Sequence, residues 1–272
     1  MGAGNRTRRR RLMLATTVAS LLLVTGCATR LTPLDPAYAG GMLTSEASDT
    51  YGLSASEGTV TISAPASNVG SNTRMAFWQA GGTASTDQQT CATWDQTSSP
   101  GRQHGAALRA RTVNGRTSAI TITNNVLFGG RWGFNIHVMD SGMSPTFHQI
   151  GGFDLGEVFR PGAPENVIAV PLPWRMCARA IGDVVSFIVW PLTHPQPEWG
   201  DPRYGGSVQL PAGWSTAGTP GWYMGHLEAG YSASFSDLVA GPLSTTEARR
   251  GEQVLSSGEA RVRQPTWIAR AP

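Results

Sequence analysis

Lysine is absent from this chain of 272 residues, and all 21 of its basic residues are arginines. Charged residues make up only 14%, and no apolar run reaches the roughly 20 residues that a membrane-spanning helix needs. Five of the arginines lie within the first eleven residues, before any acidic residue. Without them, 16 arginines face 18 acidic residues, a net charge of −2. The basic character therefore belongs to the N-terminus, and the rest of the chain gives no indication of nucleic-acid binding.

The N-terminus has the layout of a secretory signal. The basic cluster Arg8–Arg11 precedes an uncharged stretch, Leu12–Val24, that is too short to cross a bilayer. The following Val24-Thr25-Gly26-Cys27 resembles the lipobox of bacterial lipoproteins. This resemblance implies cleavage before Cys27 and acylation of its thiol, which would anchor the protein at the extracytoplasmic face of the cell membrane. The alternative is an ordinary signal peptide that happens to contain a cysteine.

Composition divides the chain into four parts. The first is the lipoprotein signal peptide, residues 1–26. Residues 27–56 mix Thr, Ser, Ala, Gly and Pro with few large apolar side chains, which predicts a lipidated, flexible tether. Residues 57–242 form the folded domain. Residues 243–272 are polar and charged, and this tail is expected to be either a short helix or disordered.

Short alternating runs with Gly and Pro about every ten residues indicate an all-β domain, an antiparallel sandwich or barrel. The clearest hairpin joins Trp174–Ile181 to Val184–Trp190 through Gly182-Asp183. Glycine accepts positive φ at the first position of a two-residue type II′ turn, so this turn fixes the register.

The register places unlike residues on the two faces of the hairpin. One face is wholly apolar and is predicted to lie in the core; it carries Met176, Ala178, Ala180, Val185, Phe187 and Val189. On the other face Arg175 is opposite Trp190, and Arg179 is opposite Ser186, with Cys177 between the two arginines. This mixed face is predicted to be either exposed to solvent or the lining of a groove.

The segments Trp174–Arg179, Gly182-Asp183 and Phe187–Pro191, with the later Gly221–Gly225 and Phe235–Leu238, resemble strands of concanavalin A-like and laminin G-like jelly rolls. The resemblance implies two curved antiparallel sheets and, often, carbohydrate recognition on the concave side. If the mixed face of the hairpin lines that side, Trp190 is expected to contact a bound glycan.

Two cysteines remain once Cys27 is assigned to lipid. Cys91 and Cys177 would lie outside the membrane, where a free pair tends to oxidise, so a disulfide between them is predicted. The alternative is two separately buried thiols, since free cysteine packs as a small apolar side chain.

Catalytic and metal-binding patterns are missing from the sequence. There is no Glu-x-Asp-x-x-Glu run like that of the glucanases with this fold, and the spacing of Asp154 and Glu157 predicts a loop pair. The five histidines have no metal-ligand spacing, so no metal or other cofactor is expected. Enzymatic activity is therefore unsupported.

Tryptophan is the informative residue that remains. Its faces stack on the C–H faces of sugars, while Arg and Asp bond the hydroxyls. The Pro-stiffened segment 194–204 follows Trp190 directly. The candidate ligand-binding residues are Trp190, Arg175, Arg179, Trp199, Asp201 and Tyr204. The predicted function is binding of a polysaccharide or cell-wall glycan at the membrane. The alternatives are a glycan-active hydrolase or lyase, and a structural or interaction protein of the envelope.

The lipid anchor can be tested on Cys27. Because acylation requires its thiol, Cys27→Ser should abolish labelling by a palmitate analogue and leave the protein uncleaved or released. Metabolic labelling of both forms measures this, and equal labelling of the two would refute lipidation at this residue.

Overall fold

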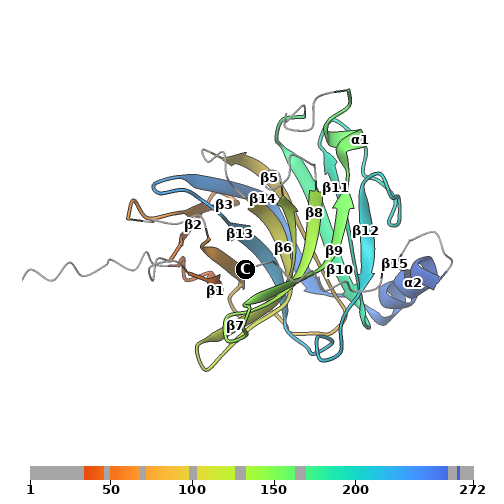
Figure 1. Cartoon of the computed structure of the whole chain (residues 1–272), viewed down its shortest axis with the longest axis horizontal. Coiled ribbons are helices and arrows are strands. Elements are labelled where there is room, and N and C mark those ends of the chain that lie inside the picture. The colour runs from red at the N-terminus through yellow and green to blue at the C-terminus, as the bar shows by residue number, and fades with distance from the viewer. Residues whose placement is uncertain are drawn as a thin grey trace, which may run out of the picture. The chain divides into compact units, whose positions relative to one another are not determined.

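The computed structural model describes residues 34–45, 50–67, 72–97, 103–125, 133–162, 170–256 and 262–263. The predicted signal peptide and Cys27 lie outside these ranges. Within them, no helix is both long and apolar enough to cross a membrane. Two sheets pack face to face as a sandwich (Figure 1), and all strand pairs are antiparallel except β12 with β15. The predicted all-β jelly-roll sandwich is therefore confirmed.

The first sheet has seven strands. In spatial order they are β1 (Tyr38–Thr44), β4 (Arg74–Gln79), β13 (Thr219–Gly225), β6 (Gln103–Val113), β7 (Arg116–Asn125), β8 (Gly133–Asp140) and β9 (Phe147–Asp154).

The second sheet has eight strands. In spatial order they are β15 (Val262–Arg263), β12 (Gly205–Gln209), β11 (Val184–Pro191), β10 (Trp174–Ile181), β5 (Gln88–Thr97), β14 (Ser232–Pro242), β3 (Thr59–Ser63) and β2 (Gly52–Ser56). Two helices complete the described structure, the short α1 (Gly156–Phe159) and α2 (Thr245–Ser256).

The sandwich starts earlier than the sequence predicted. Strands β1 and β2 fall inside the expected tether of residues 27–56, and each pairs with a strand of the folded domain. Their sequences, YAGGMLT and GLSAS, carry few large apolar side chains, so they have no strand signal of their own. The interactions that stabilise β1 come from a strand distant in sequence, because its residues pair with residues of β4 that lie 30 to 41 positions further along the chain. For the C-terminal tail the sequence left two alternatives, a short helix or disorder, and residues 245–256 form the helix α2.

The predicted hairpin has the predicted register. Ile181 pairs with Val184, Arg179 with Ser186 and Arg175 with Trp190. Gly182 has φ of 56°, as the first residue of a type II′ turn requires. The apolar face lies between the sheets, where Phe187 is 1% exposed. Several large rings fill the same core: Trp94, Trp174, Trp222, Phe77, Phe134, Phe159 and Phe235.

The outer face of the seven-stranded sheet is concave. Strands β4 and β9 are five positions apart in the sheet, which is about 24 Å if the sheet is flat. The guanidinium of Arg74 on β4 nevertheless lies 5.0 Å from the ring centroid of Phe147 on β9. At the other end β1 reaches β7, since a Cβ added to Gly41 would lie 2.1 Å from Thr117 Oγ1. The sheet is therefore rolled toward this face.

The disulfide is formed as predicted. Cys91 on β5 and Cys177 on β10 are directly paired across neighbouring strands, with their Cα atoms 4.1 Å apart. Both sulfur atoms belong to the outer side of the eight-stranded sheet, because the neighbouring Ala92 and Met176 point into the core. The bond thus ties together the two central strands of that sheet.

The disulfide can be tested by chemistry and by stability. A tryptic digest without reductant should join the peptide 176–179 to the peptide containing Cys91. Because the closed loop spans 86 residues, the double variant Cys91→Ala/Cys177→Ala should lower the free energy of unfolding by about 4 kcal/mol. Denaturant titration measures the loss. Two free thiols in the folded, unreduced protein would contradict the assignment.

Candidate functional site

The mixed face of the hairpin is the outer face of the eight-stranded sheet, and a loop covers it. Cys91, Cys177, Ile188 and Trp190 form a small apolar cluster of their own, against which Trp199 and Tyr204 of segment 192–204 pack. Trp190 is consequently only 3% exposed. The face is neither open surface nor groove at this point, because the loop that follows β11 folds back over the strands that precede it.

The covering loop is held by contacts within itself. His194 Nδ1 lies 3.1 Å from the Tyr204 hydroxyl oxygen. The Arg203 guanidinium donates to both carboxylate oxygens of Asp201 and lies 5.6 Å from the Tyr204 ring centroid. The bonds from Arg203 also lower the pKa of Asp201, so this carboxylate is ionised at neutral pH. Three prolines, Pro195, Pro197 and Pro202, further restrict the backbone. The loop is therefore a pre-ordered surface.

An arginine–tryptophan stack joins the loop to the sheet. The Arg179 guanidinium carbon lies 4.1 Å from the centroid of the Trp199 ring, a cation–π contact. Below the ring, Arg179 Nε donates to Ser186 Oγ at 3.1 Å. Arg179 is 7% exposed, whereas Trp199 keeps part of its ring accessible. The stack thus fixes one partly exposed indole on a buried cation.

A polar strip continues this face across β5 and β14. Arg175 Nη1 donates to Thr93 Oγ1 at 3.1 Å and lies 3.6 Å from Asp237 Oδ2. Beside them Ser236 donates to Asp95, whose pKa is raised by burial and by the neighbouring Asp237 carboxylate. No local sequence pattern links Asp95 to Asp237. Only the pairing of β14 with β5, over about 140 residues of chain, brings them together.

All six residues predicted to bind ligand lie on this one side of the sandwich. Trp190 and Arg179 are buried beneath the loop, while four keep accessible surface: Arg175, Trp199, Asp201 and Tyr204. The arrangement offers an aromatic platform with carboxylate and guanidinium groups at its edges. Contact of these residues with a ligand stays a prediction.

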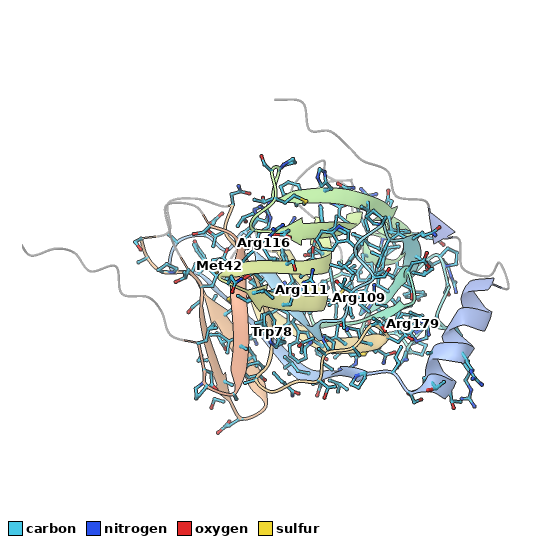
Figure 2. The ribbon with its side chains drawn as sticks, turned by 90° about the horizontal axis from the view of Figure 1, so that it is seen from below. Met42, Trp78, Arg109, Arg111, Arg116 and Arg179 are labelled. Carbon is cyan, nitrogen blue, oxygen red and sulfur yellow. A yellow bond between two sulfur atoms is a disulfide. The ribbon has the colours of Figure 1, made fainter. Side chains whose placement is uncertain are left out.

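The concave face lies on the other sheet, so the mixed face does not line it. Figure 2 shows this separation, with Trp78 toward β1 and Arg179 toward α2. Alanines and Tyr223 form the apolar part of the concave face, where Tyr223 is 1% exposed and donates to Gln103 Oε1. On the same face His137 and Gln149 are partly exposed. The buried hydroxyls of Thr121 and Thr123 have no hydrogen-bond partner among the described residues.

The predicted loop pair Asp154 and Glu157 lies at the junction of a strand and a helix. Asp154, the last residue of β9, accepts a hydrogen bond at Oδ1 from the Gly156 backbone N–H at 2.9 Å, and Glu157 lies in α1. Within the described ranges, no group of three or more His, Cys, Asp and Glu side chains could hold a metal ion.

No protein-family profile matches the chain, and no curated protein matches it at a significant level. Solved structures with a similar fold include a galectin-like protein of unknown function from Bacillus subtilis (12% identity, 75% of this chain and 89% of that chain, TM-score 0.44). A second is an alginate lyase from Klebsiella pneumoniae (15% identity, 72% of this chain and 85% of that chain, TM-score 0.41). A third is a β-1,3-1,4-glucanase from a mouse hindgut metagenome (10% identity, 78% of this chain and 97% of that chain, TM-score 0.43). The likeness concerns the fold alone.

Burial of Trp190 leads to a stability prediction. Trp190→Ala should lower the free energy of unfolding by roughly 3–5 kcal/mol, because the ring packs beside the disulfide under the loop. Phe187→Ala, on the core face of the same strand, should cost a similar amount. Denaturant titration of both variants measures this. A melting temperature unchanged in Trp190→Ala alone would show that the loop does not cover the ring in solution.

Proposed function

We propose that this protein is a membrane-anchored lipoprotein of the extracytoplasmic face that binds carbohydrate through the loop 192–204. The observation that carries the proposal is the partly exposed indole of Trp199, held by Arg179 from below and by a pre-ordered loop around it. A fixed aromatic ring loses little conformational entropy when a sugar stacks on it, which favours binding.

The groups around Trp199 complete the chemistry of sugar recognition. Of the tryptophans in the described ranges, Trp78, Trp199 and Trp214 keep accessible surface, and Trp199 has an ion pair, Asp201–Arg203, on its own loop. Charged donors and acceptors of this kind bond sugar hydroxyls, while the indole contacts the C–H faces. The Arg175–Asp237 pair on the polar strip can extend the contact to a further sugar unit.

The anchor limits how far the sandwich extends from the membrane. Six residues separate the predicted lipid-bearing Cys27 from Leu34, where the described structure begins. That segment spans at most about 20–25 Å when extended. A ligand for a protein held so close is a glycan of the envelope itself, which supports the cell-wall assignment.

A glycan array, followed by titration of the best ligand, tests the proposal. Trp199→Ala should weaken binding by about 1–3 kcal/mol because it removes the aromatic anchor. The matched control is Trp78→Ala, a partly exposed tryptophan of the other sheet, which should bind like the unaltered protein. Loss of binding in Trp78→Ala with none in Trp199→Ala would place the site on the concave sheet. Absence of any glycan ligand would refute the function.

A further inference from the structure

Three arginines of the described chain are more than nine-tenths buried, and they differ in their partners. Arg109 donates to the backbone carbonyls of Thr86, Trp214 and Gly182. Arg74 donates to Thr44 and Asn72 and also lies over an aromatic ring. Arg179 makes one hydrogen bond, from Nε to Ser186 Oγ. Among the described residues, neither Nη1 nor Nη2 of Arg179 has a hydrogen-bond acceptor.

The charge of Arg179 is also uncompensated. Arg179 takes part in none of the ion pairs among the described residues. The Trp199 ring lies over its guanidinium but carries no negative charge. Burial lowers the pKa of its guanidinium to about 10, and no carboxylate counters that effect. The group is still protonated at neutral pH. A buried cation without a counter-ion is unfavourable, so an anion at this place would be strongly attracted.

The residues beside Arg179 suit an anion. Across four neighbouring strands, β5, β10, β11 and β12, strand pairing aligns Gln89, Arg179, Ser186 and Ser207 in one row. The row holds an amide, a guanidinium and two hydroxyls, all of which donate hydrogen bonds, and no carboxylate. The planar guanidinium fork matches the two oxygens of a carboxylate or a phosphate.

We infer that this row, centred on Arg179 beneath Trp199, binds the anionic group of an acidic carbohydrate, either the carboxylate of a uronic acid or the phosphate of a phosphorylated sugar. The inference rests on the proposed function and specifies its ligand. In this account Trp199 stacks on the sugar ring, and its contact with Arg179 places the cation next to the charged substituent.

The test uses probes in matched pairs, with the protein purified as the cell exports it. Tetragalacturonic acid is compared with galactotetraose for the carboxylate, and galactose 6-phosphate with galactose for the phosphate. Calorimetric titration should show at least one anionic probe bound tenfold or more tighter than its neutral partner. The pair that shows the preference identifies the anion. Equal binding within both pairs, or no binding of either anionic probe, would overturn the inference.

Substitutions of Arg179 test whether the preference for anionic probes depends on this residue. Arg179→Met should reduce the preference to near unity while leaving the melting temperature equal or higher, because the buried charge is gone. Arg179→Lys keeps the charge without the planar fork and should retain part of the preference, which covers the case that the methionine variant fails to fold. An unchanged preference in both variants would contradict the assignment.

Arg116→Met is the matched control. It removes the same charge from an exposed residue of the seven-stranded sheet, outside the proposed site, whose guanidinium is already paired with Asp140. The preference should survive there, and an equal loss in both arginine variants would indicate long-range attraction instead. If Trp199→Ala weakens the binding of neutral glycans but no Arg179 variant changes the preference for anionic probes, this inference fails and the proposed function stands. If Trp199→Ala alters the binding of no glycan, neutral or acidic, the proposed function itself fails.

Discussion

The covalent bond between Cys91 and Cys177 is the constraint on which the candidate site depends. It joins β5 to β10 in the middle of the eight-stranded sheet, between the half that carries the loop and the half that carries the polar strip. Trp190 packs beside it, and Trp199 and Tyr204 pack on the same cluster. Because the disulfide lies on the outer face of the sheet, it provides an apolar surface on which the loop packs. Packing on that surface holds Trp199 in contact with Arg179.

The outer face of the seven-stranded sheet, on the opposite side of the sandwich, is lined by small residues. Its sheet is rolled until β1 approaches β7, and this is sterically feasible because small residues line the fold, among them Gly41, Ala76, Ala107 and Ala119. A side chain in place of Gly41 would overlap Thr117. Apolar side chains such as Ala76, Ala107 and Tyr223 therefore pack against one another on this face. On the loop side, Trp199, Asp201 and Tyr204 keep part of their surface accessible.

Much of the fold could be predicted from short-range patterns in the sequence. The Gly182-Asp183 turn and the alternation around it were sufficient to predict the register of β10 and β11, because both features act within a few residues. The disulfide followed from there being two cysteines outside the predicted anchor. By contrast, β1 has two glycines and few apolar side chains, so its strand conformation depends on β4 and could not be predicted from its own sequence.

The site was predictable only in part, for the same reason. Sequence periodicity placed Arg175, Arg179 and Trp190 on one face, since side chains alternate along a strand. It could not show that the loop after β11 returns to cover that face, nor that Asp237 lies beside Arg175, because both depend on long-range packing. The prediction that the face with Trp190 is either exposed to solvent or the lining of a groove was therefore wrong at Trp190, although the residues it named do gather on one side.

The central claim is that ligand is bound by the loop side of the sandwich, with Trp199 on Arg179 at its centre. Hydrogen–deuterium exchange with and without the best array ligand tests it most directly. The account predicts slower exchange on ligand binding at backbone amides of 198–204 and of β10 around Arg179, with β7 and β8 unchanged. Protection confined to β7 and β8, with no change in the loop, would contradict the account and assign binding to the concave sheet.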